Sequence, residues 1–364
     1  MLDNPSTTAT AEARRQIEIC NACRYCEGYC AVFPAMTRQR AFADGDMTQL
    51  ANLCHNCRGC YYACQYTEPH EFAVNLPAAL AEARQDSWDR FAWPGVFAGM
   101  FQRRAGAMIA VLIAAIALLF GMALWLRPES GEGFYAYLSH GIMVALFTPA
   151  FLFPVLALTI GVRRYWNEVG GEPVHFADLR QAGIDAASLR NLSGGQAGAC
   201  NFEAEDRFTN ARKHAHQAVM WGFLLCFGST TSATIMHYFL DWSAPYGPLT
   251  PPKLLGVPGG ILMTIGAGYL AWVKTKADPS LGAKAFGGEV AFTLLLGAVG
   301  ATGLALYAAT GTGAVPALLA IHLGCVLAFF LTTPYSKMAH GAYRFAALVR
   351  EAQIKRQGRS GRES

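Results

Sequence analysis

Eight of the eleven cysteines in this 364-residue chain stand in two copies of one spacing near its start. Thiolates bind iron–sulfur clusters and zinc, and in oxidising surroundings they form disulfides. Three cysteines separated by two residues can hold three corners of a [4Fe–4S] cube, and the fourth cysteine of each run usually completes the other cube. We therefore expect two [4Fe–4S] clusters, with Cys20, Cys23, Cys26 and Cys30 in the first run and Cys54, Cys57, Cys60 and Cys64 in the second.

Two other uses of these cysteines remain open from the residues alone. Disulfides need an oxidising compartment, and the residues before Cys20 are polar, without the apolar stretch of a secretory signal. Structural zinc favours pairs of cysteines separated by a longer spacer. Bacterial two-cluster ferredoxins share the spacing but place proline directly after the fourth cysteine, where Ala31 and Gln65 stand in this chain. Clusters are the first expectation, and zinc and disulfides are the alternatives.

The elements that would position these ligands change character after the cysteine runs. Six later stretches are long and apolar enough to cross a hydrocarbon core, which takes about 20 residues. The sequence predicts a mainly α fold with three parts. Residues 1–105 would form a two-cluster ferredoxin-like domain, and residues 106–340 a six-helix membrane bundle with a cytoplasmic loop at 163–213. Residues 341–364 would form a basic cytoplasmic tail, expected as an interfacial helix. The six predicted spans are Ala107–Leu126, Leu138–Val162, His216–Leu240, Leu254–Val273, Val290–Thr310 and Val315–Tyr335.

Lysine and arginine are concentrated on one side of the predicted bundle. Segments 163–213, 274–288 and 337–364 hold 7, 3 and 7 of them, and the chain before the first span holds 10. The three opposite loops hold only Arg127 and Lys253. Since cytoplasmic loops are enriched in basic residues, both termini and the cysteine runs are expected in the cytoplasm. Because the charge follows the membrane rather than forming one basic patch, we do not expect nucleic-acid binding.

Six of the nine histidines fall inside or at the edge of a predicted span, where ionisable residues are costly and usually functional. Histidine is an axial ligand of haem iron, and helical bundles build such sites from side chains on facing helices. No Cys-x2-Cys-His sequence is present to attach a haem covalently, so any haem would be of b type. The candidate haem ligands are His140, His216, His237, His322 and His340.

Helix length narrows the pairing of these histidines. His216 and His237 are 21 residues apart, or about 31 Å of helix, so they belong to opposite membrane faces. His322 and His340 are 18 residues apart, or about 27 Å if the helix continues. We expect His216 with His340 on the cytoplasmic side and His237 with His322 on the outer side, with His140 competing for the outer site. One haem or two remain open, and each histidine could instead be a hydrogen-bonded core residue or a proton relay.

The order of these parts resembles that of the tricarballylate/citrate-utilisation B proteins. The resemblance covers nearly the whole chain and rests on the twin cysteine runs, the loop LRNLSGGQAGACNFEAEDRFTNARKHAH leading into WGFLLCFGSTTSATIMHYF, and the later SKMAHGAYRFAAL. The membrane part is also similar to the dihaem cytochrome subunits of nitrate reductases. The resemblance supports the eight N-terminal cysteines as cluster ligands and, more weakly, His216, His237 and His340 as haem-side histidines.

Members of that family are taken to reoxidise an FAD-dependent dehydrogenase and to pass the electrons through two [4Fe–4S] clusters and haem b to quinone. The resemblance implies an electron-transfer subunit of the bacterial cytoplasmic membrane, an oxidoreductase component rather than a stand-alone enzyme. Its partners would be a dehydrogenase of tricarballylate or citrate type, membrane quinone and the lipid bilayer. A transporter or a redox sensor with a regulatory iron–sulfur domain remains the alternative, although the spans contain no acidic residue in their cores and no clear inverted repeat.

Overall fold

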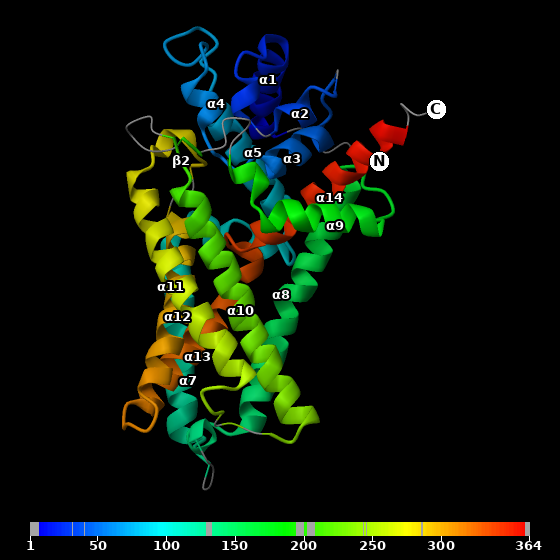
Figure 1. The fold of residues 1–364 in the computed structure, drawn as a ribbon. Helices are drawn as coiled ribbons and strands as arrows, with labels where there is room; N and C mark the ends of the chain where they lie inside the picture. Colours follow the sequence, from blue (N-terminus) through cyan, green and yellow to red (C-terminus); the bar gives the residue numbers. More distant parts are fainter. Residues whose placement is uncertain are drawn as a thin grey trace.

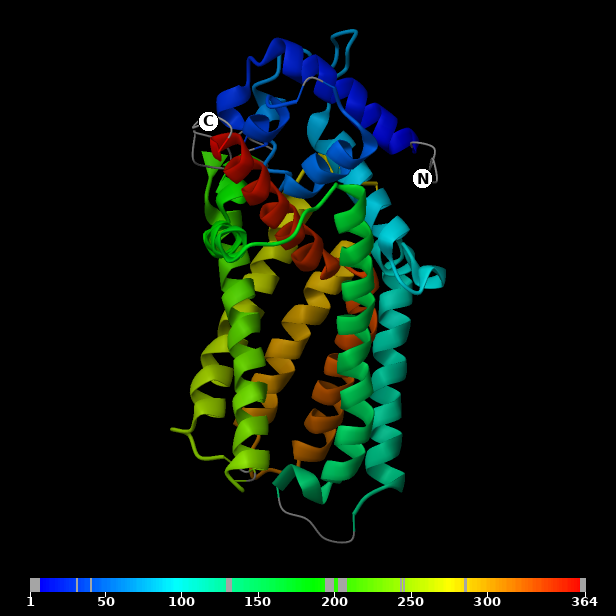
Figure 2. The ribbon, with the colours of Figure 1, turned by 90° about the vertical axis from the view of Figure 1, so that its right-hand side faces the viewer.

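The protein consists of a bundle of long helices with the cysteine-rich N-terminal part at one end, as Figure 1 and Figure 2 show. The predicted mainly α fold is confirmed. We call the described residues from 7 to 103 the head. The computed structural model describes residues 7–30, 32–39, 41–128, 133–193, 200–201, 208–242, 244, 246–284 and 287–360.

Two of the head helices are fixed by polar side chains at their first residues. The Thr7 hydroxyl accepts a hydrogen bond from the backbone N–H of Thr10 (3.2 Å), and Asn75 does the same for Ala78 (3.2 Å). The longer helices α1, α3 and α5 contact one another and enclose the head's hydrophobic core. The head helices are α1 (Thr8–Cys23), α2 (Phe33–Met36), α3 (Asp44–Leu53), α4 (Gly59–Tyr62), α5 (Leu76–Phe91) and α6 (Met100–Arg103).

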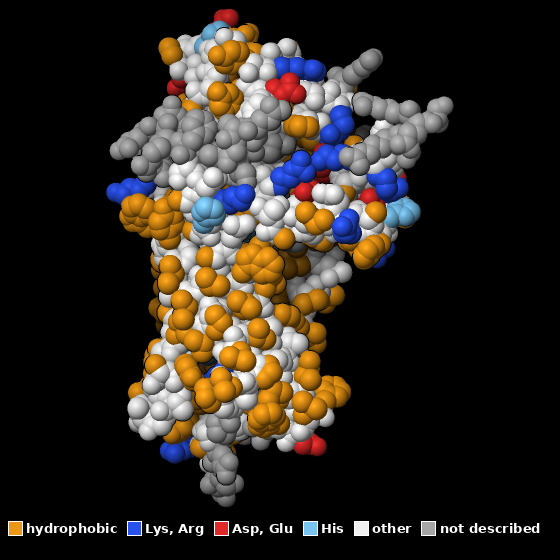
Figure 3. Space-filling model, in the orientation of Figure 1, with side chains coloured by type: hydrophobic (Ala, Val, Ile, Leu, Met, Phe, Trp, Pro, Cys, Tyr) orange, Lys and Arg blue, Asp and Glu red, His pale blue; other side chains and the backbone are white. Residues whose placement is uncertain are grey.

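Among the described residues, six helices are long and apolar enough to cross a membrane, as predicted. Large apolar side chains such as Leu118, Leu156 and Ile265 are exposed on them, which suits helices surrounded by lipid. Figure 3 shows hydrophobic side chains over the visible face of the bundle. The six are α7 (Ala105–Trp125), α8 (His140–Glu168), α10 (Ala211–Phe239), α11 (Pro251–Lys276), α12 (Gly287–Ala308) and α13 (Val315–Thr332), the last followed by a 3₁₀ turn (Thr333–Tyr335).

Glycines allow two of the spans to approach closely. A Cβ added to Gly222 on α10 would lie 2.6 Å from the backbone nitrogen of Met263 on α11, closer than real Cβ contacts. A Cβ added to Gly259 on α11 would lie 2.9 Å from the backbone of α10. Small residues of this kind let membrane helices associate through van der Waals packing. Helix α10, which carries two of the candidate histidines, is therefore fixed against α11.

Helix α8 continues beyond the predicted span, which ends at residue 162, and reaches Glu168 under the head. Tyr165 is completely buried, and its hydroxyl donates a hydrogen bond to Gln49 of α3. Glu168 accepts two hydrogen bonds from Arg90 of α5, at 2.7 and 3.0 Å. These extra turns are stabilised by the head rather than by lipid, so hydropathy alone did not reveal them.

The residues predicted as a basic tail form helix α14 (Ala339–Ser360), which packs into the head. Tyr343 and Ala347 are buried in the same hydrophobic core as α1, α3 and α5. The Gln49 side chain donates a hydrogen bond to the Ala347 carbonyl at 2.8 Å. The predicted helix is therefore present, but a separate tail is a wrong description, because the apolar face of α14 completes the core of the head.

The predicted cytoplasmic loop 163–213 lies only partly among the described residues. It contains α9 (Phe176–Ala187), which packs along α14. It also contains the antiparallel two-residue strands β1 (Cys200–Asn201) and β2 (Phe208–Thr209). The residues between 193 and 200 and between 201 and 208 lie outside the described part of the chain.

The first and last described helices, α1 and α14, lie at the same end of the bundle (Figures 1 and 2). On the face shown in Figure 3, Lys and Arg side chains gather mainly where the bundle meets the head. An even number of spans returns the chain to the side on which it started. Which membrane face carries the head stays a prediction.

Candidate functional site

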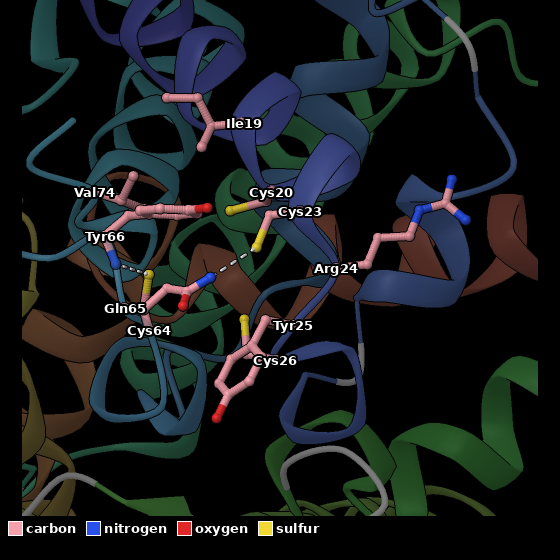
Figure 4. Close-up of a pocket in the computed structure, with 10 residues that line it drawn as sticks. All are labelled: Ile19, Cys20, Cys23, Arg24, Tyr25, Cys26, Cys64, Gln65, Tyr66 and Val74. Atoms are coloured by element: carbon pink, nitrogen blue, oxygen red, sulfur yellow. Dashed lines mark hydrogen bonds between the residues drawn. The ribbon is translucent and has the colours of Figure 1, made fainter.

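Four cysteines surround a small pocket on the surface of the head; we call them the distal set. Figure 4 shows Cys20, Cys23, Cys26 and Cys64 around this pocket, with Tyr25 beside it. The chain reverses at Arg24, which ends α1 in the left-handed conformation with a φ of 55°. Burial, followed by the neighbouring cysteines, raises the pKa of the thiols of Cys20 and Cys26, the latter to about 12. The distal set therefore consists of Cys20, Cys23, Cys26 and Cys64.

The other four cysteines are Cys30, Cys57 and Cys60, which are buried, and Cys54, which is half-buried; we call them the proximal set. A hydrogen bond between the thiols of Cys60 and Cys30 lowers the pKa of Cys30 and raises that of Cys60. Cys54 follows the last residue of α3. Cys57 packs with residues of the bundle side, including Val273 of α11. The proximal set therefore stands between the distal set and the membrane helices.

Each set takes three cysteines from one run and the fourth from the other. Cys64, from the second run, lines the pocket together with three cysteines of the first run. Cys30, from the first run, is hydrogen-bonded to Cys60 of the second run, although it also lies near Cys26. Within the described residues, no three His, Cys, Asp or Glu side chains lie close enough to share one metal ion. A cubane cluster does not require such a group, because each thiolate binds a different iron. The crossed arrangement fits two [4Fe–4S] clusters.

A cavity of about 220 Å³ lies between the head and the bundle; we call it the interdomain cavity. His55 and Asn56, from the second cysteine run, line it on the head side, and α10, α11, α12 and α14 line it on the bundle side. The Glu289 carboxylate forms ion pairs with both Lys274 and Lys337. The charged residues that line the cavity are Arg58, Arg84, Arg212, Lys274, Lys337, Arg344, Asp278 and Glu289.

His216 and His340, which were predicted to pair on the cytoplasmic side, both line this cavity. The ring centroids of His216 and His340 are 5.8 Å apart and the rings are perpendicular. With Nδ1–H donating to the Lys337 carbonyl, His340 keeps Nε2 as an acceptor, the arrangement typical of metal-binding histidine. Burial and the nearby Arg344 lower the pKa of His340, which favours the neutral, ligating form. Nδ1 of His216 is buried and has no hydrogen-bond partner among the described residues. The pair fits the axial ligation of a haem.

At the opposite end of the bundle the structure corrects the predicted pairing. His237 lies beside His140, with ring centroids 4.4 Å apart, and Tyr135 lies 5.4 Å from His140. His322 instead shares a hydrogen bond with the Thr302 hydroxyl (3.1 Å). The pairing of His237 with His322 was wrong, because His322 lies seven residues into α13, about 10 Å deeper than the helix start. A ligand role for His140, His237 and His322 stays a prediction.

Sequence reasoning missed most of the charged residues of the interdomain cavity, including Arg84, Glu289 and Arg344. Arg344 could have been found from the sequence, because it follows His340 by four residues and therefore shares its helix face. Glu289 directly precedes a predicted span, which also marks it as a charge at a membrane edge. Arg84 lies on a polar helix of the head, and nothing in the sequence around it points to the cysteines.

Comparison with known proteins gives matches over both parts of the chain. The model of the family described as citrate utilization protein B matches residues 102–361, and the model of its Fer4-like domain matches residues 13–89. The citrate utilization protein B of Escherichia coli is 40% identical over 359 residues, which cover 97% of this chain and 94% of that relative. No solved structure matches the chain significantly.

Proposed function

Because the chain belongs to the citrate utilization protein B family, we propose that it is a membrane subunit carrying electrons from a flavoprotein dehydrogenase to quinone. The dehydrogenase would oxidise citrate or a related tricarboxylate such as tricarballylate. The protein would lie in the bacterial cytoplasmic membrane with both termini in the cytoplasm. The clusters and haem, when bound, supply one-electron transfer, and the protein supplies binding, orientation and electrostatics.

The observation that carries this proposal is the succession of three sites along the molecule. The distal set opens at the surface of the head, beside the exposed ring of Tyr25. The proximal set comes next, and His55 and Asn56, which stand between Cys54 and Cys57 in the chain, line the interdomain cavity. The histidine pair lies in that same cavity. Such a succession favours electron transfer over a sensor or a transporter, which need no continuous series of redox sites.

Each group of residues has a defined task in this proposal. The eight cysteines would hold the two clusters, and the head core would shield the proximal set from water. His216 and His340 would hold a haem b at the head end of the bundle, where His340 is oriented by its bond to the Lys337 carbonyl. His140 and His237 would be the residues available for a second haem.

The first experiment is an anaerobic difference spectrum, reduced minus oxidised, of the purified wild-type protein, with iron and haem quantified. We expect b-type haem bands and about eight further irons per chain, the content of two cubane clusters. The variants H216A and H340A should each lose the bands of one haem and keep the cluster iron.

His214→Ala is the matched control, because His214 is exposed and lies on the same helix two residues before His216. It should keep all haem bands. Iron without any haem bands in the wild-type protein would contradict the proposed path and favour a sensor or transporter with an iron–sulfur domain.

A further inference from the structure

Two arginines from different helices converge on one residue of the proximal set. Arg84 of α5 and Arg344 of α14 each donate a hydrogen bond to the backbone carbonyl of Cys54, both at 2.9 Å. Arg84 is 5% exposed and bonds in addition to the Ala51 carbonyl at 3.2 Å. Two guanidinium groups thus lie against the loop that presents the Cys54 thiol.

In the described part of the chain, no acidic side chain neutralises these two positive charges. Among the described residues, neither Arg84 nor Arg344 forms an ion pair with a carboxylate, although buried charges are normally paired. Their oxygen partners are neutral carbonyls. An anion that balances them is therefore expected at Cys54 itself.

We propose that Arg84 and Arg344 raise the reduction potential of the cluster held by the proximal set. A cluster that accepts one electron becomes more negative by one unit, and two nearby guanidiniums stabilise this reduced form more than the oxidised form. The effect is large where water is excluded. The pair therefore offsets the penalty that burial imposes on the reduced cluster, and it favours electron movement from the distal set towards the membrane.

The distal set has no equivalent of this pair. Its nearest arginine in sequence, Arg24, bonds to Asn21 and is exposed to solvent. Within the described residues, no arginine side chain donates a hydrogen bond to the backbone of Cys20, Cys23, Cys26 or Cys64; only the backbone N–H of Arg24 donates to the Cys20 carbonyl, at 2.9 Å. The inference rests on the proposed function only in requiring a cluster at the proximal set.

The test is a potentiometric titration followed by electron paramagnetic resonance on the full-length protein with its clusters loaded. The proximal signal is identified as the one missing in C60S. In the double variant R84Q/R344Q, the equilibrium constant for reducing the proximal cluster should fall at least tenfold, which is 59 mV for a one-electron couple. Each single variant should shift the potential of the proximal cluster by less, and the potential of the distal cluster should not change.

Matched controls are available on the same two helices. Arg90→Gln on α5 and Arg350→Gln on α14 remove the same charge from arginines that pair with Glu168 and Glu172 instead. They should leave both potentials unchanged. An unshifted proximal potential in the double variant, or an equal shift in the controls, would overturn the inference.

A lysine variant separates charge from structural support. If R84Q/R344Q does not load the proximal cluster, R84K/R344K keeps both charges and should load it with a potential close to that of the wild type. Failure of the lysine variant to load the cluster would mean that the guanidiniums only support the fold. Absence of cluster signals from the wild-type protein would instead contradict the proposed function, on which this inference depends.

Discussion

The distal and proximal cysteine sets have the same ligand spacing but different surroundings. The distal set borders a surface pocket next to Tyr25, which is 69% exposed. The proximal set is enclosed by α3, α5 and α14 and borders the interdomain cavity through His55 and Asn56. Spacing in sequence thus specifies the ligand pattern, whereas the tertiary surroundings specify which set faces the surface and which set faces the bundle.

The two sets also differ in the charge of the side chains that surround them. Around the proximal set, cations are brought in from helices far apart in the chain, since Arg84 and Arg344 are separated by more than half its length. At the distal set, a neutral side chain contacts a ligand sulfur: the Gln65 amide donates to the Cys23 sulfur at 3.7 Å. A shared motif can therefore give two cofactors of unequal potential within one small domain.

The largest expected effect tests the crossed assignment of the fourth cysteines. C64S should weaken or remove the cluster of the distal set, and C30S that of the proximal set, each at a loss of about four irons per chain. Iron analysis and electron paramagnetic resonance of both variants would show which cluster each fourth cysteine holds. If C64S removed the signal that C60S also removes, the two sets would not be crossed.

The next effect concerns the support beneath the proximal set. Glu289→Gln should lower the free energy of unfolding by about 2–3 kcal/mol, because it leaves the ammonium groups of Lys274 and Lys337 without their carboxylate. Thermal unfolding of the detergent-purified protein measures this change. Arg103→Gln, which breaks a more exposed pair with Asp89, is the comparison and should change stability much less.

A third change acts on the bundle alone. Gly222→Val should destabilise the contact between α10 and α11 by about 1–3 kcal/mol, because its side chain would collide with the backbone near Met263. It should reduce the b-type haem bands and leave the cluster signals intact. Gly268→Val is the control, since no atom lies within 4 Å of a Cβ at that position. Equal loss of clusters and haem would contradict the separation of head and bundle sites.

The smallest effect is expected on the surface of the head. Arg15→Gln breaks a solvent-exposed pair with Glu12 and should cost no more than about 0.5 kcal/mol. The hydrogen bond from Arg15 lowers the pKa of Glu12, so this contribution is present above the ordinary pKa of 4.5 and is lost as the pH falls through the lowered value. The difference in unfolding midpoint between variant and wild type should therefore be larger at pH 7 than at pH 3.

Much of the architecture followed from local patterns. Six apolar stretches predicted six long helices because a membrane span needs a fixed length of apolar residues, and the described residues contain six such helices. Helix ends were less predictable: the last turns of α8 carry Tyr165 and Glu168, which are stabilised by contacts with the head. Contacts with the head also hold α14, whose Tyr343 and Ala347 are buried in the head core, and a basic sequence pattern does not predict such contacts.

The histidines show the same limit within the bundle. Helix length correctly separated His216 from His237 and brought His216 to His340, because rise per residue is a local property. It failed for His322, which lies seven residues inside α13 and bonds to Thr302. The neighbours of His237 are Tyr135, in the turn before α8, and His140, the first residue of α8, rather than a residue of α13.

The sequence by itself determined the likeness of the two cysteine runs, the six spans and the family, since each is encoded in consecutive residues. Only the tertiary structure decided which cysteines share a set, which histidines face each other, and that Arg84 and Arg344 meet at Cys54. The physical reason is that ligand spacing depends on local backbone geometry, whereas the charge and burial around a cofactor depend on segments that meet only after the chain has folded.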